Sequence, residues 1–386
     1  MRKSALLWLG LVVTALVALG LVVLSSASGA NAERLHGGDA YFFMKRQFAY
    51  LGVGILIAAA VASFDYRHWR DSPWLVWMFF IVVMVLLVAV FKFKAINGSH
   101  RWISVGPLRL QPSEFAKLVT VILMSVWLDK SGWRVELFLR GALWPAVIIG
   151  VIAAPILLEP DFGSVMVVGA VGFLMMFVAG TRLLHMAPFA LVGVAVVAYR
   201  VLTNANRMAR IAAFFGIKMD VGAEVLDAAA ERAAYQVNMA LAAIGNGGIW
   251  GVGLGESMQK QLYLPEAHTD FVFAVGAEEF GVVFSVVVVL LFAAFFALSV
   301  YVAHHASDRF GRFLVIGMAF IIFFQAMFNI GVVCKALPTK GMALPFFSYG
   351  GTNLLSAFFA VGTILSVGIH SMRDRAHMLG RKVLMR

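Results

Sequence analysis

The sequence predicts an all-α, polytopic membrane protein with about ten transmembrane helices and one large extracytoplasmic loop between the seventh and eighth helices. Of the 386 residues, 62% are hydrophobic and only 13% are charged. Soluble domains contain about 45–50% apolar and about 25% charged residues. The mean hydropathy of +0.90 therefore excludes an ordinary soluble enzyme. Each bilayer crossing needs about 20 apolar residues, so about ten crossings fit within this chain.

Hydropathy predicts spans at residues 5–24, 46–64, 73–91, 113–128, 141–158, 162–179, 184–202, 271–302, 310–334 and 350–370. The first span follows Arg2 and Lys3 and precedes a run of small residues, as in a secretory signal. Its apolar core of about 20 residues is longer than the 7–15 residues of a signal peptide. We therefore interpret it as a retained span.

The basic residues of the short loops predict which side is cytoplasmic, because Lys and Arg accumulate there. One side carries Arg2, Lys3, Arg67, Arg70, Lys130, Arg134, Arg140, Arg182, Arg309, Arg312 and the basic tail of residues 371–386. An even number of spans places both termini on that side. Residues 1–386 then form a single integral membrane domain, in which residues 203–269 are the large extracytoplasmic loop.

Basic residues also occur on the predicted outer side. Residues 91–112 carry Lys92, Lys94, Arg101 and Arg109, although only long loops are exempt from the positive-inside rule. A cationic outer loop favours an anionic ligand on that face. The net charge of +11 does not indicate nucleic-acid binding, because no segment is both soluble and basic. Anionic lipid headgroups are the simpler partner.

The large loop contains one predicted helix and one glycine-rich segment. Residues 224–244 place apolar side chains at helical spacing and end at Gly245, a natural C-cap. We expect this helix to lie in the outer interface or to pack over the bundle. Residues 245–255 are glycine-rich like a phosphate-binding loop, but no strand precedes them and no Lys-Ser/Thr pair follows. We expect a flexible external loop there.

Ionisable residues inside spans are costly, so each is a functional candidate. A helix is expected to begin near Pro112, with Glu114 and Lys117 one turn apart on one face. This pair could be structural or could bind a substrate phosphate. Glu159 and Asp161 separate two spans with almost no loop. They could bind a divalent cation, but Asp161 as the N-cap of the next helix is favoured.

Residues 263–270 run directly into the eighth span and place Asp270 at its outer end. Partial burial there would raise the pKa of the carboxyl group and make it a better base. The alternative role for Asp270 is a helix cap. Glu278 lies about two turns further along the helix, on nearly the same face.

Residues 335–351 contain two prolines and three glycines, which forbid a regular helix. Irregular backbone at membrane depth is tolerated only where it lines a cavity or packs within protein. Lys340 is then a mobile cation at the mouth of a cavity.

Together these segments resemble the SEDS family (shape, elongation, division and sporulation), the bacterial FtsW/RodA proteins. The likeness covers nearly all of residues 5–370. Its most specific marks are Arg101-Trp102 and residues 112–117, 159–164, 235–236, 264–270, 278–279 and 337–351. Residues 255–260 and 337–341 are more similar to the division branch, FtsW, than to the elongation branch, RodA.

The resemblance implies a peptidoglycan glycosyltransferase that polymerises lipid II, an undecaprenyl-diphosphate-linked disaccharide peptide, at the outer face of the bacterial cytoplasmic membrane. It also implies that Asp270 is essential and that Trp102 is needed. Inverting transfer requires a general base and cations for the departing diphosphate. Asp270 is the predicted base. The predicted substrate-binding residues are Arg101, Trp102, Glu114, Lys117, Arg207, His268, Glu278 and Lys340.

The implied partners are a class B penicillin-binding protein and other membrane proteins of the divisome. No cofactor is expected with certainty, and help from a divalent cation is left open. The main alternative is a lipid II flippase, because intramembrane charges and a central cavity also suit a transporter. The outer position of Asp270 and the lack of an inverted repeat favour the enzyme. A non-enzymatic scaffold would leave the buried carboxylates unexplained.

Overall fold

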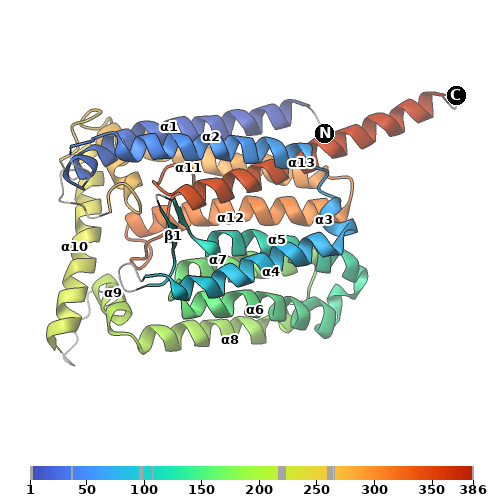
Figure 1. Cartoon of the computed structure of the whole chain (residues 1–386), viewed down its shortest axis with the longest axis horizontal. Coiled ribbons are helices and arrows are strands. Elements are labelled where there is room, and N and C mark those ends of the chain that lie inside the picture. The colour runs from blue at the N-terminus through green and yellow to red at the C-terminus, as the bar shows by residue number, and fades with distance from the viewer. Residues whose placement is uncertain are drawn as a thin grey trace.

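The computed structural model describes residues 3–35, 38–94, 99–106, 108–215, 223–258, 264 and 266–384. Most of its helices lie side by side in one bundle, and α10 crosses one end of that bundle (Figure 1). The long helices of the bundle are α1 (Lys3–Leu35), α2 (Phe42–Ser63), α4 (Pro73–Ala89), α5 (Pro112–Ser131), α6 (Trp144–Leu158), α7 (Phe162–Ala179), α8 (Leu183–Leu202), α11 (Val272–His304), α12 (Arg309–Val333) and α13 (Gly351–Leu384).

The remaining elements are short or lie outside the bundle. They are α3 (His68–Asp71), η1 (Val90–Lys92), β1 (Ile103–Val105), β2 (Leu108–Leu110), η2 (Gly132–Glu136), η3 (Phe138–Leu143), α9 (Ala205–Phe215) and α10 (Ala223–Gly247). Strands β1 and β2 form an antiparallel hairpin that pairs Ile103 with Leu110. The sequence did not predict this hairpin, because each strand has only three residues.

The predicted polytopic all-α fold is confirmed. In the described part of the chain, nine helices are long and apolar enough to span a membrane. Helix α5 is the further bundle helix that matches the fourth predicted span; it has 20 residues. Its acidic and basic residues lower its hydropathy. The helix predicted at residues 224–244 is α10, which ends at Gly247, three residues beyond the predicted end.

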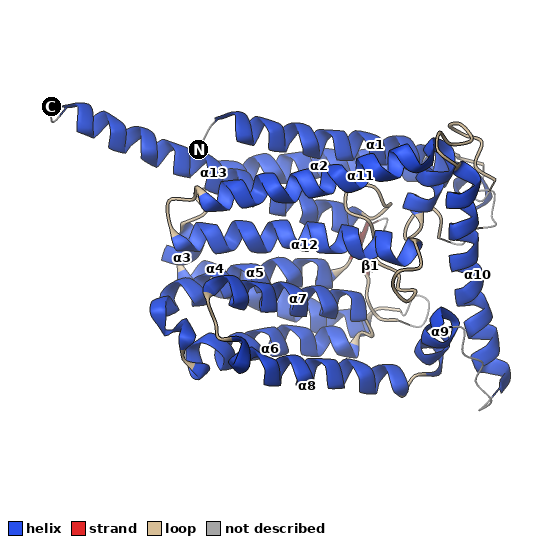
Figure 2. Cartoon of the chain, turned by 180° about the vertical axis from the view of Figure 1, so that it is seen from behind, coloured by secondary structure: helices blue, strands red, loops and turns tan. Residues whose placement is uncertain are grey.

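Both chain termini lie at one end of the bundle, and α9, α10 and β1 lie at the other (Figures 1 and 2). We call the end with α9, α10 and the β1–β2 hairpin the loop end. This arrangement agrees with the even number of crossings expected from the sequence.

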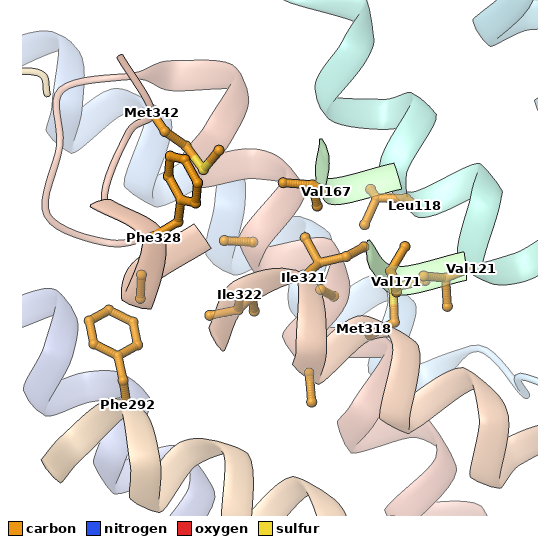
Figure 3. Packing of buried hydrophobic residues seen from close by; sticks show 14 of the residues in the cluster. Leu118, Val121, Val167, Val171, Phe292, Met318, Ile321, Ile322, Phe328 and Met342 are labelled. Carbon is orange, nitrogen blue, oxygen red and sulfur yellow. The ribbon is translucent and has the colours of Figure 1, made fainter. Parts of the chain in front are cut away.

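The core of the bundle centres on α12, which packs against α5, α7, α11 and α13. Figure 3 shows the packing of side chains from α12 (Met318, Ile321, Ile322), α5 (Leu118, Val121) and α7 (Val167, Val171). Helix α8 is much less buried, because only 6% of the residues in its most apolar 18-residue segment are buried within the protein. Helix α12 is therefore a fixed reference for the side chains it carries, whereas α8 lies at the edge of the bundle with few buried residues.

The glycine-rich residues 247–253 pack against a break in α11. The break is at Gly281, where φ is 76° and ψ is −168°, a conformation that glycine adopts most readily. Val252 N–H donates to the Glu278 carbonyl (3.0 Å), and Val282 N–H donates to the Gly248 carbonyl (2.9 Å). A Cβ added at Gly251 would overlap the Glu279 carbonyl oxygen. These bonds satisfy backbone groups that an interrupted membrane helix would otherwise leave unpaired.

The expectation that residues 245–255 form a flexible external loop was therefore wrong over the part that contacts α11. Sequence inspection identified glycines that permit bending. In the structure they permit close backbone contact instead, which ties the end of α10 to the half of α11 nearest the loop end.

Candidate active site

Asp270 lies in a turn just before α11. Its backbone N–H donates to the Glu266 carbonyl (3.1 Å), and its own carbonyl accepts a hydrogen bond from Nδ2 of Asn329 on α12 (2.7 Å). The N-cap residue of α11 is Phe271, and it provides no side-chain cap. The Asp270 carboxylate therefore does not serve as the helix cap that the sequence left as an alternative.

The electrostatic surroundings of Asp270 suit a base. Burial raises the pKa of its carboxyl group to about 6, and Glu266 adds to the rise. The charges of Arg210, Arg101 and Lys340 oppose it. A carboxylate with this pKa is ionised at neutral pH and is a stronger proton acceptor than an ordinary aspartate.

The loop of residues 335–350 lies against the turn that carries Asp270. Ser348 Oγ donates to the Thr269 carbonyl, and Tyr349 N–H donates to the His268 carbonyl (2.9 Å). A Cβ added at Gly341 would collide with Oδ2 of Asp270. The irregular backbone expected here is confirmed, and its close approach to Asp270 requires glycine at position 341.

Lys340 precedes this glycine and points toward the start of α7. Its Nζ lies 5.2 Å from the centroid of the Phe162 ring. Burial lowers the pKa of Lys340 to about 7, and the neighbouring Arg101, Arg210 and Arg207 lower it further, while Asp161 opposes them. An anionic ligand bound beside Lys340 would therefore stabilise the protonated, charged form of its side chain.

Asp161 is the N-cap of α7, as the sequence favoured, and its Oδ1 accepts from Ser164 N–H (3.5 Å). Its Oδ2 accepts hydrogen bonds from Ser113 Oγ (2.9 Å), Ser164 Oγ (2.6 Å) and Gln111 Nε2 (3.1 Å). Burial opposes ionisation, but Arg101, Lys340 and the two hydroxyls hold the pKa of Asp161 at about 2. Asp161 is therefore a permanent negative charge beside the cations.

Arg101 and Glu159 flank the same corner. Arg101 donates a hydrogen bond from its guanidinium to the Pro160 carbonyl. Glu159 is fully buried, and neither carboxylate oxygen has a hydrogen-bond partner in the described structure. Burial and the charge of Asp161 raise the pKa of Glu159 to about 8, so its neutral form dominates at pH 7.

Arg207, on α9, completes the cationic group. Its guanidinium carbon lies 4.0 Å from the centroid of the Phe162 ring, so Phe162 contacts two cations at the start of α7. Arg207 also donates to the Arg200 carbonyl (2.7 Å). The structure thus brings three predicted cations, Arg101, Arg207 and Lys340, within electrostatic reach of one another.

Glu114 and Lys117 form a buried ion pair. Lys117 Nζ lies 2.7 Å from Glu114 Oε1, and the Lys117 side chain is only 1% exposed. The second oxygen of Glu114 accepts from Asn353 (3.2 Å) and Ser356 (3.0 Å) of α13. These contacts join α5 to α13 and support the structural role. Direct binding of substrate phosphate stays a prediction.

Three other predicted substrate-binding residues lie in different surroundings. His268 stacks on Phe43 with ring centroids 4.7 Å apart, and Trp102 is partly exposed directly before β1. Glu278 is 1% exposed and accepts a hydrogen bond from Ser257. The Glu278 side chain therefore holds Ser257, just beyond the glycine-rich segment, and substrate contact by Glu278 stays a prediction.

The sequence did not indicate Asn329, Phe162, Gly341 or Arg210 as site residues. The apolar pattern of α12 gave no sign of a role for Asn329, and Phe162 and Gly341 stood out only as parts of family-like segments. These residues matter because they contact segments far away in the sequence. Among the described residues, no group of three or more His, Cys, Asp or Glu side chains could hold a metal ion.

Comparison with known proteins matches residues 6–373 to the FtsW/RodA/SpoVE family, described as cell cycle proteins. "Probable peptidoglycan glycosyltransferase FtsW" of Thioalkalivibrio sulfidiphilus is 38% identical over 97% of this chain and 92% of its own length. A chain from a study of polymerisation and crosslinking by a peptidoglycan synthase complex superposes with TM-score 0.71 at 26% identity, covering 94% of this chain and 97% of that one. The rod shape determining protein RodA of Thermus thermophilus gives TM-score 0.66 at 28% identity, covering 95% and 96%.

Proposed function

This chain belongs to the FtsW/RodA/SpoVE family and is a peptidoglycan glycosyltransferase, and we propose that it polymerises lipid II into glycan strands at the outer face of the cytoplasmic membrane. The observation that carries the proposal is one carboxylate at the loop end, Asp270, surrounded by Arg101, Arg210 and Lys340. A base beside several cations is what transfer from a sugar diphosphate requires.

In the proposed reaction, Asp270 accepts the proton of the 4-hydroxyl group of one lipid II molecule. The hydroxyl oxygen attacks the anomeric carbon of a second molecule and forms the new glycosidic bond. The bond from that carbon to the diphosphate oxygen breaks, and undecaprenyl diphosphate leaves with the electron pair. One such displacement converts the α-linked donor into a β-1,4-linked product.

Arg101, Arg207 and Lys340 are the proposed contacts of the diphosphate. Negative charge on the leaving group grows in the transition state. Cations that are already held in position therefore stabilise the transition state more than they stabilise the bound substrate. The negative charge of Asp161 acts on Arg101 and Lys340, which lowers the cost of holding these two cations close together without substrate.

Two aspects of the cellular role are part of the proposal. The similarity of residues 255–260 and 337–341 to the division branch and the 38% identity to a protein named FtsW support septal wall synthesis. The basic short loops lie on the side of the termini, which supports cytoplasmic termini and an extracytoplasmic site.

We expect a class B penicillin-binding protein to activate this chain through α10, α11 and α12. The membrane-facing side of α11 exposes Val283, Val287 and Leu290 at 43%, 41% and 61%, at helical spacing. The complex should polymerise lipid II about 5- to 150-fold faster than the chain alone, the usual range of allosteric coupling. Purified chain and purified complex are compared at equal concentration. Equal rates would contradict the dependence on a partner.

The pH dependence of kcat/KM should be a narrow bell. Activity should rise as pH increases through about 6, because Asp270 must lose its proton to act as a base. It should fall as pH increases through about 7, because Lys340 must keep its proton. Lys340→Arg, which stays charged at all these pH values, should remove the alkaline limb and leave the acid limb. A profile that this substitution leaves unchanged would contradict the role of Lys340.

A further inference from the structure

Asn329 is a buried polar residue of α12 that the proposed reaction does not use; it is 2% exposed. Its Nδ2 donates two hydrogen bonds, one to the carbonyl of Asp270 (2.7 Å) and one to the carbonyl of Met342 (2.6 Å). The first carbonyl belongs to the turn that carries the base, and the second belongs to the loop that carries Lys340. One side-chain amide thus connects both halves of the candidate site.

We infer that Asn329 is a positioning residue that fixes the Asp270 turn and the Lys340 loop relative to each other. This inference rests on the proposed function. A primary amide supplies two N–H donors from one nitrogen, which a hydroxyl group cannot do. Loss of the amide would leave two carbonyls short of a donor in a water-poor region, which is unfavourable.

The position of Asn329 on α12 makes it a rigid reference point. Helix α12 packs against α5, α7, α11 and α13. The two hydrogen bonds of Asn329 therefore start from a helix that four neighbouring helices hold in place.

The spacing that Asn329 sets is tight. Gly341 lies between Lys340 and Met342, and a Cβ there would collide with the Asp270 carboxylate. Ser348 and Tyr349 attach the far end of the loop to residues 268–269, and Asn329 attaches the end beside Lys340. A shift of about 1 Å between a base and its substrate can reduce rate about a hundredfold.

Asn329→Ala in the purified complex with the class B penicillin-binding protein should lower kcat for lipid II polymerisation about ten- to a hundredfold. The KM should change less than kcat, because the variant retains Arg101, Arg207 and Lys340, the side chains proposed to bind the diphosphate. Gln325→Ala is the matched control. Gln325 lies one turn earlier on α12, is 4% exposed, and in the described structure makes no hydrogen bond to either segment. Its kcat should stay near that of the wild type.

The pH profile separates positioning from folding. Asp270 faces Glu266 on its own turn, Arg210 on α9, Arg101 before β1, and Lys340 on the loop. Release of the turn would admit water to Asp270, so the acid limb of Asn329→Ala should move to lower pH. A residue needed only for folding would reduce activity equally at every pH and leave the limb in place.

Double substitution gives a second readout. Ser348→Ala removes another bridge between the same two segments, so its effect on kcat should be less than additive with that of Asn329→Ala. If Asn329→Ala is not monodisperse, Asn329→Ser, which keeps one donor, takes its place and should show a smaller loss with the same shift of the acid limb. Failure of both variants to fold would make Asn329 a folding residue and overturn the inference.

The wild-type complex distinguishes the inference from the function on which it rests. If the wild type polymerises lipid II and Asn329→Ala retains its kcat and acid limb, the inference fails alone. If the wild type forms no polymer, the proposed function fails and the inference fails with it.

Discussion

Asp270→Asn is expected to abolish polymerisation of lipid II while the protein still folds and binds its partner. Asparagine has nearly the same size and can occupy the space beside Gly341, and the backbone bond to Asn329 does not involve the side chain. An amide cannot accept the proton of the acceptor hydroxyl. General-base catalysis contributes about 10²- to 10⁴-fold, and a loss of that size is expected.

Gel separation of the products from fluorescent lipid II measures this loss directly. The matched control is Asp39→Asn, the same chemical change at a carboxylate that pairs with exposed Lys45 at 2.9 Å, outside the candidate site. The control should polymerise normally, and both variants should elute as the wild type does. Near-normal glycan synthesis by Asp270→Asn would contradict the proposal that Asp270 is the general base.

Substitution of Arg101 or Lys340 is expected to give the next largest losses. Removal of one charge-assisted contact costs about 1.5–3 kcal/mol, roughly ten- to hundredfold in rate. Lys340→Gln should show this loss. Arg101→Lys should also be impaired, because the guanidinium that reaches the Pro160 carbonyl would lose its two-pronged geometry.

Each variant has a control close to it in the structure. Lys335→Gln removes an exposed cation from the start of the same loop, and Arg109→Lys makes the same change on the exposed side of β2. Both should keep most of the wild-type rate in a detergent assay with labelled lipid II. If all four variants lose activity equally, general outer-surface charge rather than a diphosphate site would explain the result.

Sequence alone predicted the parts of this protein that depend on local pattern. The apolar runs located the bundle helices, Pro112 marked the start of α5, and Asp161 was identified as the N-cap of α7. These predictions succeeded because helix boundaries and span lengths are set by neighbouring residues. The place of Asp270 at the outer end of a span made it the predicted base, and its catalytic role stays a prediction.

The missed features depend on residues far apart in the chain. Asn329 connects a turn 59 residues before it to a loop 13 residues after it, and the apolar pattern of α12 gives no sign of either contact. The glycines near residue 250 predict a flexible loop from sequence alone. The sequence does not show that they pack against α11, which is broken at Gly281.

Purified complex, incubated with labelled lipid II in detergent, tests the central claim most directly. Detergent abolishes sidedness, so transport across a membrane cannot contribute to the signal. A glycosyltransferase should convert lipid II into long β-1,4-linked strands that a muramidase digests to disaccharide units. Unchanged lipid II in detergent, together with protein-dependent movement of lipid II across vesicle membranes, would contradict the enzyme and support a flippase.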